Sequence, residues 1–210
     1  MAEIKRFFAL SIIVFSNFVF AQFNVQLFDQ DHNPVSRAVI SIPAEIEPNA
    51  AAKIAVMDQI NREFVPRVLT INLGQFVSFP NSDNIRHHVY SFSDAKPFEI
   101  KLYRGTPTEP DLFDKPGIVI LGCNIHDHMV GYIHVAGKEV TALTDENGIA
   151  VFNRKTPNAV KIWHSQLSKS ATKIISRPLE KQNDNGVWQL TAYLQPLVIK
   201  KPRKFKARFK

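Results

Sequence analysis

Apolar and polar positions alternate in short runs between residues 22 and 198, a pattern typical of β-strands with one buried face. Proline, glycine, asparagine and aspartate separate the runs, as they do at turns. No segment of this region keeps the 3.6-residue apolar period of an amphipathic helix. The pattern predicts an all-β protein, and 210 residues are enough for one large domain or two small ones.

The predicted strands form three groups along the chain. The first is a hairpin, in which residues 23–27 alternate, a turn spans 29–34 and a second strand covers 39–42. The strand at 98–103, in the second group, alternates strictly, so its apolar side chains up to Leu102 are predicted to share one face. This second group has seven strands in about 90 residues, the density of a β-sandwich, and they cover residues 54–57, 68–71, 76–79, 89–92, 98–103, 118–121 and 132–135.

The third group begins with two alternating runs, 140–143 and 149–152, which Asp145-Glu-Asn-Gly148 separates as a hairpin turn would. Further strands are predicted near residues 160–163 and 188–194. The segment from Val25 to Val39 and the segment Thr144-Asp-Glu-Asn-Gly148 resemble the two signature segments of transthyretin-like or carboxypeptidase-regulatory-like β-sandwiches.

That resemblance implies a small sandwich split by an insertion. Residues 22–44 would supply its first strands and residues 138–198 the remainder, while residues 45–137 form the inserted domain, entered through a linker at 45–52. The alternative is that residues 22–44 simply extend the middle sandwich.

Both ends of the chain carry signals outside the predicted sandwiches. Lys5 and Arg6 precede an apolar run from Phe7 to Phe20, so residues 1–21 read as a secretory signal peptide cleaved after Ala21. The alternative, a retained membrane anchor, is disfavoured because the run is shorter than the ~20 residues that span a bilayer. We therefore expect an exported, periplasmic protein.

The formal net charge of +7 is concentrated at the C-terminus. Residues 200–210 hold seven lysines and arginines and no acid, which leaves the chain between signal peptide and tail nearly neutral. We expect residues 199–210 to be a basic, disordered tail, with weak contact to an anionic membrane or an acidic partner as its functional alternative. No nucleic-acid partner is expected for an exported protein.

The chain has a single cysteine, so no intramolecular disulfide can form in an oxidising compartment. Cys123, His126 and Met129 follow one another at spacings of three on a loop between two predicted strands, and the adjacent pair His87 and His88 offers a second imidazole from the end of a neighbouring strand. Zinc seldom uses a thioether ligand, whereas two histidines, a cysteine and a weak axial methionine form the blue-copper arrangement. The motif predicts one copper ion, cycling between Cu⁺ and Cu²⁺.

Residues 53–136 resemble the cupredoxin (blue copper) family, in particular its amicyanin- and plastocyanin-like members with a compact Cys-x-x-His-x-x-Met loop. Asn81, six residues before His87, and Val89, two residues after it, match the family pattern. The resemblance implies a Greek-key β-sandwich and assigns Asn81 to steadying the cysteine loop. With Phe64-Val-Pro and Trp163-His164, the chain is also similar to proteins called methylamine utilization proteins.

Two further histidines lie next to predicted ligands. Neighbours on a strand point to opposite faces, so choosing His87 as the ligand leaves His88 facing solvent. His128 departs from the amicyanin pattern, and we interpret it as a surface residue near the copper that tunes it or accepts a proton. The choice between His126 and His128 as the loop ligand stays open at this stage.

These residues favour a one-electron carrier between periplasmic protein redox partners. The alternatives are a module for copper storage, delivery or sensing, and a structural sandwich whose metal loop is vestigial. We do not expect an enzyme. Multicopper oxidases need several His-x-His pairs, and this chain has one, at 126–128. No oxyanion-binding motif accompanies Cys123 for nucleophilic catalysis.

Overall fold

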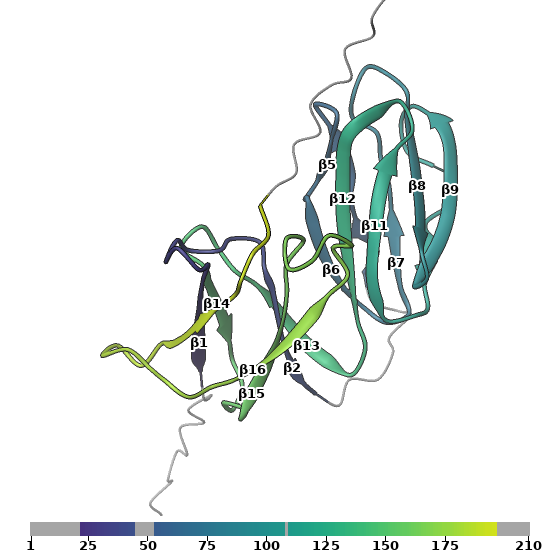
Figure 1. Cartoon of the computed structure of the whole chain (residues 1–210). Coiled ribbons are helices and arrows are strands. Elements are labelled where there is room, and N and C mark those ends of the chain that lie inside the picture. The colour runs from purple at the N-terminus through teal and green to yellow at the C-terminus, as the bar shows by residue number, and fades with distance from the viewer. Residues whose placement is uncertain (1–21, 45–52, 108, 197–210) are drawn as a thin grey trace, which may run out of the picture.

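A computed structural model describes residues 22–44, 53–107 and 109–196. All regular secondary structure in these residues is β-strand (Figure 1). The all-β prediction is confirmed. Within these ranges no helix is long and apolar enough to cross a membrane. The predicted signal peptide at 1–21, the linker at 45–52 and the basic tail at 199–210 lie outside the described residues.

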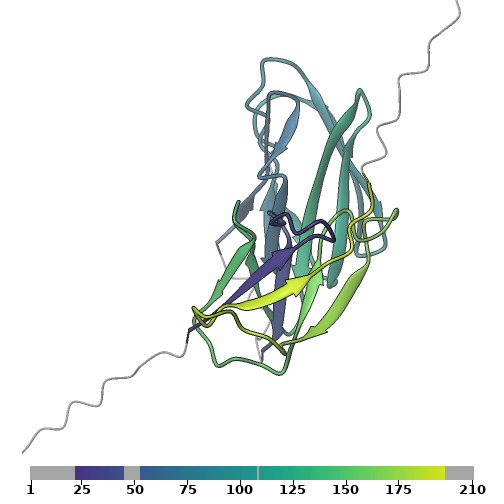
Figure 2. The ribbon, with the colours of Figure 1, turned by 60° about the vertical axis from the view of Figure 1, so that its left-hand side comes forward.

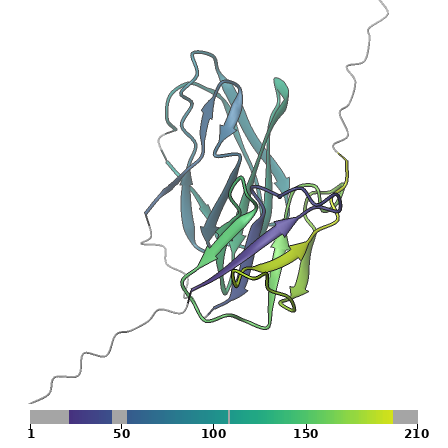
Figure 3. The ribbon, with the colours of Figure 1, turned by 90° about the vertical axis from the view of Figure 1, so that its left-hand side faces the viewer.

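One set of strands combines both ends of the described chain. Its first sheet has the order β14-β1-β17 and its second the order β13-β2-β15-β16. Figures 2 and 3 show β17, in yellow, beside β1, in purple, to which it is paired in parallel. A buried apolar cluster that includes Val25, Leu27, Ile40 and Ile162 draws on both sheets. The strands are β1 (Phe23–Phe28), β2 (Val39–Pro43), β13 (Glu139–Leu143), β14 (Ile149–Phe152), β15 (Ala159–Trp163), β16 (Ile174–Pro178) and β17 (Trp188–Thr191).

Both hairpins predicted in this set are wrong. β1 pairs with β14 and β17, while β2 pairs with β13 and β15, so β1 and β2 belong to different sheets. β13 and β14 are likewise in different sheets, although the N–H of Gly148 donates to the carbonyl of Asp145 in a tight turn between them. Both connections are corners that carry the chain across the core, and this lets each strand turn its apolar face inward.

The second set of strands is built from residues 55–136. It contains a five-stranded sheet of order β6-β12-β11-β8-β9, a three-stranded sheet of order β10-β7-β3 and a two-stranded ribbon, β4-β5. Its own buried cluster includes Met57, Phe64, Phe79, Phe113 and Leu121. The strands are β3 (Ala55–Val56), β4 (Asp58–Ile60), β5 (Glu63–Val65), β6 (Val68–Asn72), β7 (Gln75–Ser78), β8 (His87–Ser93), β9 (Lys96–Tyr103), β10 (Asp111–Phe113), β11 (Gly117–Cys123) and β12 (His126–Ala136).

The two sets meet in a third, small apolar cluster. Val39 and Trp163 from the first set pack with Val68 and Ile118 from the second. The ring of Tyr132 lies against Trp163 with the ring centroids 5.4 Å apart. β2 therefore faces two cores, which explains why four of its five residues are buried.

Strand β9 departs from the predicted strict alternation. Its pairing with β8 aligns His87 with Tyr103 and Val89 with Ile100, so β9 has one extra residue at a bulge. Leu102 is consequently 50% exposed, contrary to the prediction. Tyr103 instead reaches inward, and its hydroxyl donates to the carbonyl of Phe79 at 2.6 Å.

Candidate metal centre

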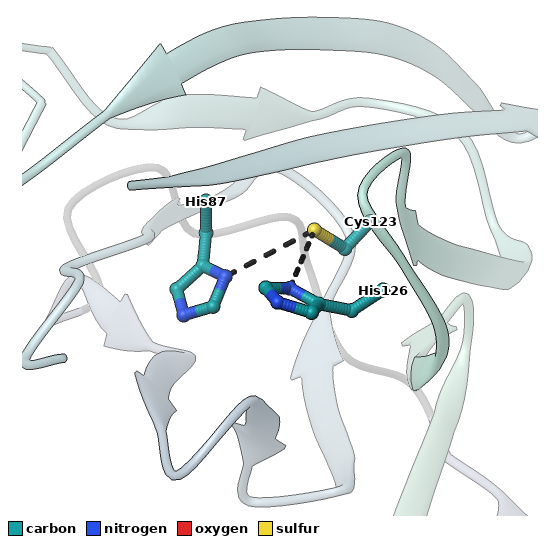
Figure 4. A group of neighbouring side chains, drawn as sticks. All are labelled: His87, Cys123 and His126. Atoms are coloured by element: carbon teal, nitrogen blue, oxygen red, sulfur yellow. Dashed lines mark hydrogen bonds between the residues drawn. The ribbon is translucent and has the colours of Figure 1, made fainter. Parts of the chain in front are cut away.

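Cys123 and His126 are held opposite each other by the turn between β11 and β12. β11 and β12 pair antiparallel, and a register shift after Gly122 makes Cys123 the direct partner of His126. The Cys123 Sγ atom lies 3.7 Å from His126 Nδ1 (Figure 4). The three-residue spacing of the motif therefore brings both side chains to one point at the upper end of β11 and β12 in Figure 1, away from the first set of strands.

His87 joins this pair from the first position of β8, the strand next to β11. Its side chain is fully buried, and its Nδ1 atom lies 4.0 Å from Cys123 Sγ. The ligand atoms of His87, Cys123 and His126 all lie within 4.8 Å of one another. The fold therefore gathers two imidazoles and one thiol from separate stretches of sequence.

The separations of these atoms fit ligands that share one metal ion. Metal–sulfur and metal–imidazole bonds of about 2.3 and 2.0 Å place sulfur and nitrogen roughly 3.5–3.8 Å apart in tetrahedral or trigonal geometry. The sulfur–nitrogen distances of 3.7 and 4.0 Å are close to that range. Residues His87, Cys123 and His126 are thus positioned to form a metal site with little rearrangement.

Met129, the fourth predicted ligand, lies on β12 three residues after His126. It is 1% exposed and belongs to the same buried cluster as Cys123. The thioether is therefore shielded from water in the core that surrounds the thiol.

A carboxylate that the sequence did not predict binds the ring nitrogen of His87 that does not face Cys123. Asp83 Oδ2 accepts a hydrogen bond from His87 Nε2 at 2.6 Å. The proton on Nε2 leaves Nδ1 as the lone-pair atom, and Nδ1 is the atom that faces Cys123. Nothing in the sequence marks Asp83 except its position four residues before a candidate ligand.

Asp83 is itself fixed in an ionised state. Its carboxylate oxygens accept the backbone N–H groups of Asn61 at 2.7 Å and Arg62 at 2.9 Å. Desolvation opposes ionisation, but these hydrogen bonds and the one from His87 outweigh it and lower the pKa of Asp83. A charged acceptor of this kind orients a metal-binding histidine.

The pKa of His126 is lowered, first by desolvation and then by the electrostatic influence of His87, Arg62 and His128. A metal-binding imidazole must be neutral, so this shift favours the binding-competent form.

Asn81 forms side-chain hydrogen bonds around the loop that precedes His87, and its steadying of the cysteine loop stays a prediction. Its side-chain amide donates to the carbonyls of Ile85 at 3.0 Å and Tyr103 at 2.8 Å, and its oxygen accepts the N–H of Asp83 at 3.1 Å. Among the described residues, these bonds tie together the loop before His87 and strand β9. Asn81 therefore shapes the site by positioning Asp83 and His87.

The two remaining histidines differ in their surroundings. His88 is only 8% exposed and its Nε2 lies 2.8 Å from Glu99 Oε1, so the prediction of a solvent-facing side chain is wrong. His88 is not among the residues grouped with Cys123. His128 is exposed, and its ring centroid lies 6.0 Å from that of His126. Of the two loop histidines, His126 is the one grouped with His87 and Cys123.

A shallow hollow of about 660 Å³ lies beside His126. Its apolar wall comes from Ile85, Leu102 and Ile125, and its charged wall from Arg86 and Arg104. The bulge in β9 turns Leu102 outward, which contributes to this wall. The hollow gives His126 an apolar, positively charged surrounding at the protein surface.

No protein-family model and no curated protein matches the sequence. Several solved structures match part of it. A copper-containing nitrite reductase from Thermus scotoductus SA-01 is 26% identical over 43% of this chain and 23% of its own, with a TM-score of 0.37. A purple cupredoxin from Nitrosopumilus maritimus is 21% identical over 39% of this chain and 99% of its own, with a TM-score of 0.35. A reduced amicyanin variant is 20% identical over 48% of this chain and 99% of its own, with a TM-score of 0.34. A cupredoxin and an amicyanin are thus among the structures similar to this chain.

Proposed function

We propose that this protein is a type 1 copper protein that carries single electrons between protein partners. The observation that supports it is the convergence of the Cys123 thiol with the Nδ1 atoms of His87 and His126, beside the buried Met129. Two imidazoles, one thiolate and a thioether are a donor set that selects copper over zinc. When bound there, copper supplies a one-electron couple between Cu⁺ and Cu²⁺.

The protein shields three of the four proposed ligands from water and holds His87 in place. Cys123 and Met129 are 3% and 1% exposed, and His87 is fully buried. Asp83 fixes His87 through a hydrogen bond, and Asn81 holds the loop that carries Asp83 through its own hydrogen bonds to Asp83 and Ile85. A site whose ligands cannot move far suits electron transfer, because little reorganisation accompanies the change of charge.

His126 is the proposed point of electron entry and exit. It is partly exposed, whereas the other three proposed ligands are buried. The apolar hollow beside it offers a surface on which a protein partner can dock. Export through the predicted signal peptide would place these partners in the periplasm. We propose no catalytic role for the chain.

Electrochemistry of the copper-loaded protein separates a carrier from a storage or delivery module. A carrier shows a reversible one-electron wave that persists over many cycles, and a chelator at moderate excess leaves the copper in place. The storage alternative is favoured by the exposed His128 next to His126, which could hand copper to another protein. It predicts rapid loss of copper to the chelator and no stable wave. His128→Ala serves as the matched variant, since a carrier should keep its wave without this ring.

A further inference from the structure

A second cavity, of about 340 Å³, opens where the two sets of strands meet, further along β12 from the metal loop. Its polar wall draws on both sets. Arg37, His164 and Ser165 come from the first set, and Arg67 and Tyr132 from the second. Its volume lies within the range of small-molecule sites, which often form between domains.

The turn that carries Arg37 is held in an unusual conformation. Arg37 has a φ of 57°, a left-handed value that residues other than glycine rarely adopt. Its N–H donates to the carbonyl of Thr144 at 2.9 Å. The buried Thr144 hydroxyl accepts the N–H of Ala38 at 2.8 Å and donates to the carbonyl of Val35 at 2.7 Å. The backbone under Arg37 is therefore fixed in place at the cavity.

Hydrogen bonds also hold the backbone at Arg67 and Tyr132 and the ring of His164. The Arg67 carbonyl accepts the N–H of Tyr132 at 2.9 Å. His164 Nδ1 accepts the N–H of Gln166 at 3.3 Å, so the ring proton of a neutral His164 is on Nε2. Burial, and then the charge of Arg37, lowers the pKa of His164 to about 4. The ring is thus a neutral donor at physiological pH, and the charge of Arg37 acts on this wall of the cavity.

The charged residues that line the cavity give it a net positive charge. Neither Arg37 nor Arg67 forms an ion pair with a carboxylate in the described part of the chain. One acid, Asp29, lines the cavity. Its oxygens already accept the backbone N–H groups of Asp31 and Asn33 and the side-chain amide of Asn33. Two arginines therefore line the cavity with one aspartate, and the acceptor sites of that aspartate are largely occupied.

We propose that this cavity binds the phosphate group of a small organic molecule. Guanidinium groups bind phosphate oxygens through paired hydrogen bonds, and hydroxyl and imidazole N–H donors complete such a site. Val35, Val68 and Leu194 form an apolar part of the wall that suits the organic portion of the ligand. A soluble phosphate ester and the headgroup of a phospholipid share this chemistry. The inference does not depend on the function proposed for the metal centre.

Calorimetric titration of the copper-loaded protein with inorganic phosphate and with phenyl phosphate tests the proposal, at constant ionic strength in a phosphate-free buffer. We expect saturable binding of one phosphate per chain, tighter for phenyl phosphate because of the apolar wall. Arg37→Gln and Arg67→Gln should each weaken it at least roughly tenfold, the usual cost of losing a hydrogen bond to a charged group. The control Arg154→Gln, at an exposed residue away from the cavity, should leave it unchanged.

A second variant and a second probe make every outcome decisive. Arg67→Lys keeps the charge but loses the paired hydrogen bonds, so it should weaken binding even if the glutamine variants fail to fold. Binding to anionic phospholipid vesicles that needs Arg37 and Arg67, without binding of the soluble probes, assigns the phosphate to a lipid. No saturable binding of any phosphate probe, tighter binding of acetate than of phosphate, or an equal loss in Arg154→Gln would overturn the proposal.

Discussion

Asp83 is the residue whose contribution to the metal centre is easiest to isolate. Its carboxylate accepts from His87 Nε2 at 2.6 Å and is anchored by two backbone N–H groups. In Asp83→Asn the negative charge is lost, and the amide can present either a donor or an acceptor to the ring. We expect copper affinity to fall by roughly 10- to 100-fold, the usual effect of losing such a partner.

Competition against a chelator of known copper affinity measures this change. Asp127→Asn is the matched control, because Asp127 is an exposed acid next to His126 on β12. Equal affinities for Asp83→Asn and the unmodified protein would show that Asp83 does not support His87.

The lowered pKa of His164 predicts that the folded protein loses stability in acid. Burial, followed by the charge of Arg37, lowers its pKa to about 4, whereas an unfolded chain has a histidine pKa of about 6.5. Below pH ~6.5 the unfolded state therefore binds a proton that the folded state does not, and stability falls until pH ~4. At pH 5 the loss from this residue is on the order of 1–2 kcal/mol.

Urea unfolding of the metal-free protein at pH 7 and pH 5, in phosphate-free buffer, measures this loss. His164→Asn should show a smaller decrease between the two pH values, while His32→Asn, at an exposed histidine, should behave like the unmodified protein. An unchanged decrease in His164→Asn would contradict the assignment. Burial also lowers the pKa of His134, so every variant should keep part of the loss of stability in acid.

At the scale of elements, the position of β12 depends on close contact with β5. A Cβ atom added to Gly131 would lie 2.7 Å from Phe64 Cβ and 2.9 Å from Phe64 Cγ. Phe64 is 2% exposed and cannot move aside without disturbing the core. We expect Gly131→Ala to lower the free energy of unfolding by about 1–3 kcal/mol, as overpacking usually does.

The control is Gly137→Ala, one residue beyond β12, where the added Cβ would meet Pro116 at an ordinary 3.5 Å. Chemical denaturation of both variants measures the effect. If Gly131→Ala is as stable as Gly137→Ala, the contact between β12 and β5 is looser than described.

The positions of the strands along the chain were more predictable than the pairing between them. Alternation of apolar and polar residues located most strands of the second set, because the burial of one face is a local property of sequence. The turn at Asp145–Gly148 misled the prediction, since the same residues serve a hairpin and a corner between sheets. The bulge that exposes Leu102 depends on pairing with β8 and leaves no local mark in the sequence.

In the metal centre too, residues close in sequence could be predicted from their spacing alone, whereas those brought together by the fold could not. Cys123 and His126 could be found because they share one loop at a regular spacing that continues to Met129, whose role as a ligand stays a prediction. The choice of His87 needed the family pattern, since only the adjacency of β8 and β11 brings it near Cys123. Asp83 could not be predicted, because its position depends on how the loop before β8 folds back on itself.

At the scale of the whole molecule, the junction cluster should make the two sets of strands unfold together. Trp163 is 1% exposed and packs with Val39, Val68 and Ile118 across the junction. Trp163→Ala removes the largest side chain of this cluster and should cost roughly 3–5 kcal/mol. We expect one calorimetric transition in the unmodified protein and two in the variant. Two transitions in the unmodified protein would show that the junction does not couple the sets.

The most direct test of the copper centre is the visible spectrum of the oxidised, copper-loaded protein beside that of Cys123→Ser. Thiolate ligation in a site with two histidines defines blue copper, so we predict an intense band near ~600 nm that Cys123→Ser abolishes and His128→Ala retains. A protein that binds copper without this band, or a band that survives in Cys123→Ser, would contradict the account.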